Sequence, residues 1–277
     1  MKKVLKKSLI AGMVTGALAM ASASAFAQAV FPDFVVNEGS VEGAIARTLT
    51  GDKITGNYVE IATFSPGTSG TFDASLKWQA GQFVGNNGTT LVDSQLGGVS
   101  GNQYGLYVLY RGNGTFEVSG GQTVFNFAPG GSFDMWIDPD SNTTFNAPAT
   151  GNADWTTGGS GDDYIIASGF PTAGQGVLNP GLSTCTGGGG SGINCGSFGT
   201  STSFSVNEEG SLFFTTPTPF YTLSFQSGQL NNFSPTGTQT VNGSLDIVFN
   251  QVPEPASVVL VGLGLLGLGL ARRRKQS

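Results

Sequence analysis

The 277-residue sequence contains no histidine and only two cysteines. Ser-His-Asp hydrolysis and Cys-His proteolysis are therefore excluded because both need an imidazole, and the usual zinc sites are excluded because they need histidine or more than two cysteines. Carboxylates, hydroxyls and amides are the groups left for chemistry, and the sequence singles out no catalytic pair among them. We expect a protein that is not an enzyme and has no resident cofactor, with calcium as the one ion to consider.

Positive charge is scarce outside the two ends of the chain. Of 12 Lys and Arg, four lie within residues 1–7 and four within residues 272–275, which leaves Arg47, Lys53, Lys77 and Arg111. Residues 28–251 carry 17 Asp and Glu against these four cations, a net charge near −13. This part of the chain will not bind nucleic acid, because phosphate contacts need clusters of Lys and Arg. High acidity is also a common solubility device in exported proteins.

The N-terminus has the pattern of a secretory signal peptide. A basic stretch with Lys2 and Lys3 precedes the apolar run 9–21, and Ala25-Phe26-Ala27 fits the small-x-small cleavage pattern. We predict a signal peptide over residues 1–27, cleaved between Ala27 and Gln28. The exported body then covers residues 28–251.

The C-terminus combines three elements in a fixed order. They are Val252, Pro253, Glu254 and Pro255, then the apolar run 256–271, then Arg272, Arg273, Arg274 and Lys275. A helix of 16 residues extends about 24 Å, somewhat short of the roughly 30 Å of bilayer hydrocarbon. The run can still be held transiently in the inner membrane, with its cations on the cytoplasmic side. The two prolines favour an extended chain that a processing enzyme can reach.

These three elements resemble the PEP-CTERM sorting signal of Gram-negative bacteria that make exopolysaccharide. The resemblance implies processing of residues 252–277 by the membrane protease-transpeptidase called exosortase. It also implies a membrane-anchored precursor and a product at the cell surface or in the extracellular matrix. An ordinary tail anchor is the alternative interpretation of the same residues.

The two cysteines fit an exported protein. Cys185 and Cys195 enclose nine residues rich in glycine, and an oxidising compartment favours a disulfide between them. Closing so short and flexible a loop stabilises a fold by about 2 to 3 kcal/mol in the chain-entropy description.

The body reads as a series of short β-strands separated by Gly, Asn, Ser, Thr and Pro. Expected strands are 58–64, 71–79, 104–110, 122–127, 133–138, 163–168, 211–215, 220–226 and 244–250. Three Asn-Gly pairs, at 87–88, 113–114 and 242–243, are hairpin-type signals, and the second should close a hairpin after Tyr110. We predict an all-β fold made of a single β-sandwich, with a jelly roll as one arrangement, followed by one apolar C-terminal helix.

Phenylalanine is abundant, with 20 residues. Exposed aromatics on a β surface can stack on sugars, so a carbohydrate-binding module is one interpretation. Phenylalanine mostly packs in cores, however, while Trp and Tyr are the usual stacking residues. We therefore expect a phenylalanine-rich core, and we expect Trp78, Trp136 and Trp155 to belong to it.

Two acidic segments offer oxygen ligands for calcium. Asp138, Asp140 and Asn142 are spaced as at the start of an EF-hand loop, but Thr143 and Ala149 stand where that loop needs Gly and Glu. A turn after a strand explains the same three residues without a metal. The second segment, 158–166, matches one nonapeptide of a calcium β-roll but occurs only once. A calcium-dependent, lectin-like carbohydrate-binding module is accordingly the alternative function.

A second resemblance covers more of the body. Residues 34–40 and 51–60, and further on 162–169 and 220–225, are similar to the flocculation-associated PEP-CTERM proteins, which hold floc-forming cells in an exopolysaccharide matrix. This resemblance implies a non-enzymatic surface or matrix protein that supports flocculation or biofilm formation. It brings no catalytic residues with it.

Overall fold

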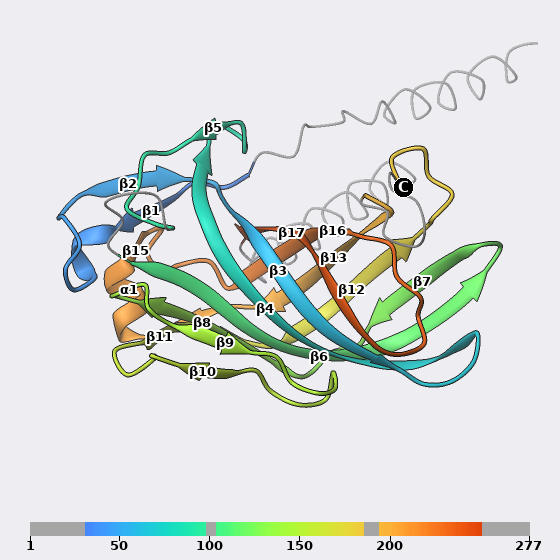
Figure 1. The fold of residues 1–277 in the computed structure, drawn as a ribbon. Coiled ribbons are helices and arrows are strands. Elements are labelled where there is room, and N and C mark those ends of the chain that lie inside the picture. Colours follow the sequence, from blue (N-terminus) through green and yellow to red (C-terminus); the bar gives the residue numbers. More distant parts are fainter. Residues whose placement is uncertain (1–30, 98–103, 186–193, 251–277) are drawn as a thin grey trace, which may run out of the picture. The chain divides into compact units, whose positions relative to one another are not determined.

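The computed structural model describes residues 31–97, 104–185 and 194–250, which form a mainly β protein (Figure 1). Eight antiparallel strands of these residues pair in a closed ring. In ring order they are β6 (Gly105–Ser119), β7 (Gln122–Phe127), β12 (Pro171–Leu178), β13 (Gly196–Ser203), β16 (Leu223–Leu230), β17 (Gly237–Asn250), β3 (Lys53–Phe64) and β4 (Ser69–Gly85). The all-β prediction is confirmed, whereas the predicted sandwich is wrong because the sheet closes into a barrel. The predicted apolar helix lies outside the described residues.

Strand β6 closes the ring because it is long enough to pair along both edges. One edge pairs with β4, from Tyr107 to Glu117. The other edge pairs first with β8 (Ser132–Asp138) and then with β7. Closure removes the free edges that two separate sheets would leave.

Further strands extend the barrel. From β8 the sheet continues to β11 (Tyr164–Gly169) and β14 (Ser205–Val206), while β5 (Thr90–Leu91) pairs with β4. A separate sheet contains β15 (Phe214–Thr216), β1 (Phe34–Asn37) and β2 (Thr48–Gly51), and β9 (Thr144–Asn146) pairs with β10 (Thr156–Gly158). Within the described part of the chain, the helices are η1 (Glu38–Ser40) and α1 (Glu208–Phe213). Neither of these two helices has the length and apolarity needed to cross a membrane.

One predicted strand and two predicted hairpins are wrong for local reasons. Residues 211–213 belong to α1, which Asn207 starts by accepting a hydrogen bond from the Gly210 N–H at 2.8 Å. The pairs 113–114 and 242–243 lie inside β6 and β17. A Cβ on Gly114 would approach the carbonyl oxygen of Asn126 to 2.1 Å, so this glycine allows close strand packing. The turn after β6 is made at Gly120 and Gly121, both with positive φ.

The core is rich in phenylalanine, as predicted. One group lies inside the barrel; it consists of Phe64 on β3, Phe72 on β4, Phe116 on β6, Phe125 on β7 and the partly buried Phe233 between β16 and β17. A second group packs between β1, β15 and β17, with ring centroids as close as 4.8 Å; it consists of Phe34, Phe204, Phe214, Phe220 and Phe249. Trp78 and Trp155 are buried, and Trp136 is half-buried.

A buried carboxylate joins the N-terminal segment to the barrel. Glu38 is fully buried, and its Oε1 accepts hydrogen bonds from the backbone N–H of Gln95 at 2.8 Å and the hydroxyl of Tyr104 at 2.9 Å. Its Oε2 accepts from the Gln95 amide and from Arg47 Nε. The Glu38 carboxylate is therefore the shared acceptor for Gln95, Tyr104 and Arg47.

Replacing Glu38 tests this junction. Glu38→Ala should lower the free energy of unfolding by about 3 kcal/mol, because the Tyr104 hydroxyl and the Gln95 N–H lose their acceptor and Arg47 loses its buried ion-pair partner. Urea denaturation of the variant measures the loss. Glu42→Ala, at an exposed position of the same segment, should stay within about 0.5 kcal/mol of the parent. Equal stability of the two variants would contradict the assigned role of Glu38.

Candidate functional site

The residues predicted for sorting and for signal cleavage lie outside the described residues. They are Val252, Pro253, Glu254, Pro255, Arg272, Arg273 and Arg274 for sorting, and Ala27 and Gln28 for cleavage. The described residues start at Phe31 and end at Asn250. The structure therefore describes the body of the protein, which this machinery would export.

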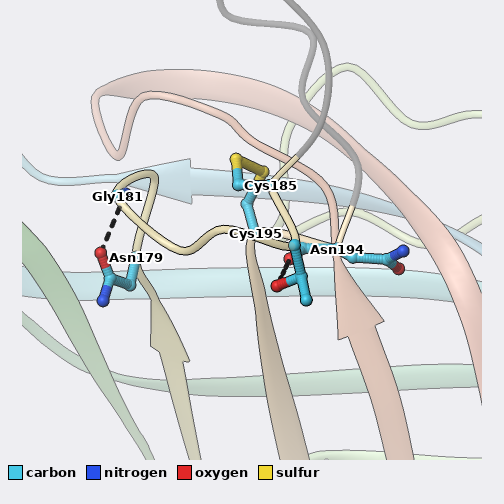
Figure 2. Close-up of a disulfide and its surroundings, with 6 residues drawn as sticks. Asn179, Gly181, Cys185, Asn194 and Cys195 are labelled. Carbon is cyan, nitrogen blue, oxygen red and sulfur yellow. Dashed lines mark hydrogen bonds between the residues drawn. A yellow bond between two sulfur atoms is a disulfide. The ribbon is translucent and has the colours of Figure 1, made fainter.

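Cys185 and Cys195 form a disulfide in the connection between β12 and β13 (Figure 2). Cys195 is buried, and its N–H donates to the carbonyl oxygen of Leu230 at 2.8 Å, at the end of β16. Nearby, the Asn179 side chain accepts from the Gly181 N–H at 3.0 Å, and the Thr184 hydroxyl donates to the Asn194 carbonyl at 3.0 Å. The disulfide thus attaches the connection to one end of the barrel strands.

The predicted calcium ligands are only partly brought together. Asp138, at the end of β8, is buried, and its carboxylate accepts from the Asn142 N–H at 3.1 Å and the Thr143 N–H at 2.9 Å. Asp140 and Asn142 enter these contacts through their backbone N–H groups, since Asp140 N donates to Asp162 Oδ2 at 3.3 Å. This geometry matches the turn interpretation, in which Asp138 orients the loop that follows it.

Three carboxylates do converge beside this loop. One oxygen each from Asp138, Asp162 and Asp163 lies within 4.8 Å of the others. Asp163 Oδ2 accepts from the Tyr107 hydroxyl at 2.6 Å and the Thr143 hydroxyl at 2.7 Å. Burial raises the pKa of Asp163, and the charges of Asp138 and Asp162 also raise it, while the two hydrogen bonds act in the opposite direction. Sequence spacing alone could not find this group, because β8 and the start of β11 meet only in the folded chain.

The barrel interior contains a carboxylate that has no hydrogen-bond or ion-pair partner among the described residues. Glu60, on β3, lines two cavities of about 20 Å³ each, together with side chains such as Trp78, Phe127 and Phe198. Each has room for about one water molecule and neither can hold a sugar or a lipid. The hydroxyl of Tyr110, which also lines the first cavity, is buried without a partner. The interior is thus a packed core around one acidic group.

Desolvation in this core raises the pKa of Glu60 to about 7 from an ordinary value of 4.5. Glu60 is therefore largely protonated in the folded protein below pH 7, whereas in the unfolded chain it ionises near pH 4.5. Since the folded state then binds more protons than the unfolded state, Glu60 makes the fold less stable as the pH rises through this window.

The four cations of the body all have partners. Arg47 pairs with Glu38 and Asp93, Lys53 with Asp246 at 3.0 Å, and Arg111 with Asp154 at 2.6 Å. Lys77 lies 4.9 Å from the ring centre of Phe145. Among the described residues, all four of these cations are therefore engaged in an ion pair or a ring contact.

Comparison with known families identifies the C-terminal segment. Residues 251–275 match the model of the PEP-CTERM protein-sorting motif. The chain therefore carries this sorting motif, which implies export with processing by exosortase and a C-terminal membrane anchor. No curated protein and no solved structure matches the chain.

The calcium prediction can be tested at the three carboxylates. Calcium bound there would raise the thermal unfolding midpoint by mass action, and Asp162→Asn would abolish the rise while leaving the buried Asp138 intact. Asp33→Asn, at an exposed position outside the group, serves as the matched control and should respond like the parent. A midpoint that calcium leaves unchanged would mean that Asp138 only orients its loop.

Glu60 gives a pH-dependent prediction. A pKa that moves from 4.5 to about 7 corresponds to about 3 kcal/mol of lost stability once Glu60 is ionised in both states. Glu60→Gln should therefore gain stability over the parent as the pH rises from about 4.5 to 8, measured by urea denaturation. Glu117→Gln, on the exposed side of β6, should show no such gain. Parallel pH profiles for Glu60→Gln and the parent would disprove the assignment.

Proposed function

We propose that the protein is a non-enzymatic surface or matrix protein that is exported, processed at its PEP-CTERM motif and retained in exopolysaccharide. The motif at residues 251–275 is the observation that carries the proposal. In this role the body supports flocculation or biofilm formation, as in the flocculation-associated proteins that residues 34–40 and 51–60 resemble.

Features of the body support a structural role outside the cell. A disulfide between Cys185 and Cys195 crosslinks the glycine-rich connection between β12 and β13. Such a crosslink is typical of an oxidising compartment. The barrel is filled by aromatic side chains, and the cavities lined by Glu60 are too small for a transported ligand. Any binding of polysaccharide would then use the outer surface of the barrel.

Deleting residues 252–277 tests the proposal in cells. The truncated protein should fold and be exported, but it should not be processed by exosortase, and the cells should disperse instead of forming flocs. Settling of the culture and mass spectrometry of the exported protein provide the two measurements.

A matched control separates sorting from the body itself. Substituting Glu42 by Ala changes an exposed residue far from the motif in sequence and should leave settling and the mature C-terminus unchanged. Normal flocs from the truncated strain would refute the proposed function.

A further inference from the structure

Four neighbouring barrel strands contain no charged residue. β7, β12, β13 and β16 follow one another in the ring, and none of them includes Asp, Glu, Lys or Arg (Figure 1). At about 4.8 Å between strands, they form a surface about 15 Å wide. We call the outward side of these four strands the neutral face. It is an uncharged surface on a body with a net charge near −13.

The neutral face exposes an aromatic ring on β16, although side chains of the same strand that point into the barrel are polar. On β16, Ser224 and Gln226 point inward, where Gln226 Oε1 accepts from Thr200 and Thr202 at 3.0 and 2.8 Å. Phe225 points outward between them and is 41% exposed. The alternation of β16 therefore places its phenylalanine in water and its amide in the core.

The ring of Phe225 lies along the sheet. A Cβ atom on Gly199 of the neighbouring strand β13 would be 2.9 Å from Cζ of Phe225. The ring thus occupies the space that a side chain at position 199 would take. An aromatic ring held along a sheet presents an apolar surface on which the C–H face of a sugar can stack.

A concavity continues the neutral face below the disulfide. Its volume is about 580 Å³, within the range of ligand sites. The lining includes Gln122, Val177, Asn179, Leu182, Asn194 and Gln229, and Figure 2 shows Asn179 and Asn194 near the disulfide. Gln229 and Phe225 lie on the same side of β16 four residues apart, about 13 Å at the rise of a strand.

The polar groups of this concavity are available for binding. The side chains of Gln122, Asn194, Ser197 and Gln229 make no hydrogen bond to another described residue. An amide offers both donors and acceptors, as does a hydroxyl, which suits sugar hydroxyls that do the same. The four strands carry no charge that would attract an ionic polymer. The negative net charge of the body also disfavours an anionic polymer.

We propose that the neutral face binds a segment of uncharged polysaccharide longer than one sugar. Phe225 stacks on one sugar ring, and the amides of the concavity hydrogen-bond sugar hydroxyls further along the chain. The inference rests on the proposed function, since it locates the contact through which the exported body is retained in the matrix.

Affinity electrophoresis tests the site. The probe is exopolysaccharide from the producing strain, separated by anion exchange into neutral and acidic fractions and cast into native gels, and the protein is purified from the same culture. The neutral fraction should retard the parent more than the acidic one. Phe225→Ala should weaken the retardation about tenfold, whereas Phe225→Tyr, which keeps the ring, should restore it.

A second variant moves the ring without removing it. Gly199→Ala places a methyl group under Phe225, an exposed side chain that can swing away, so the protein should fold and bind about threefold more weakly. Leu91→Ser, which removes an exposed apolar side chain on β5, should bind like the parent. Thermal unfolding of each variant shows that it is folded.

Several outcomes would overturn the inference. Retardation that Phe225→Ala and Gly199→Ala leave unchanged would place the contact elsewhere, and stronger retardation by the acidic fraction would refute the uncharged ligand. A dimer that Phe225→Ala dissociates in size-exclusion chromatography would make the face an interface between copies. Absence of retardation together with flocs lost on truncation would reject this site while the proposed function stands.

Discussion

The pairing of β4 with β6 is the interaction on which the structure depends. It runs from Tyr107 to Glu117 on β6 and turns an open sheet into a ring. Once the ring is closed, every barrel strand has an inner and an outer side, and the inner side must be filled. Phenylalanine fills it, and glycines such as Gly56 and Gly114 stand where a Cβ would meet a neighbouring backbone within about 2.2 Å.

The filled interior determines where binding can occur. The Tyr110 hydroxyl has no hydrogen-bond partner among the described residues, and the spaces that Tyr110 and Glu60 line admit single waters. Because the four cations of the body are used in ion pairs and one ring contact, the outer surface offers no described site for anions. What the exterior provides is acidity over most of the body and the neutral face on one side.

Features of the fold that local sequence patterns determine are predictable from the sequence. The strand at 122–127 and the phenylalanine core follow from alternation and composition, and the sorting motif is recognised as a linear segment. Closure was not predictable, because the same alternation serves a sandwich and a barrel. Asn113 and Gly114 resemble a hairpin turn, but Gly114 serves close packing against β7. The sequence indicates Asp138 and the segment 158–166 as two separate acidic candidates, but only the folded chain brings Asp162 and Asp163, just before β11, beside Asp138.

The charge distribution bears on the proposed retention in exopolysaccharide. A body with a net charge near −13 stays soluble during export, but the same charge repels acidic polymers at low ionic strength. A protein held in a polysaccharide matrix after its C-terminal segment has been processed therefore needs contacts that do not depend on charge. Aromatic stacking and amide hydrogen bonds are such contacts, because salt does not screen them. The absence of charge from four consecutive strands is consistent with this requirement, whereas solubility alone would be served equally well by acidic residues on that side.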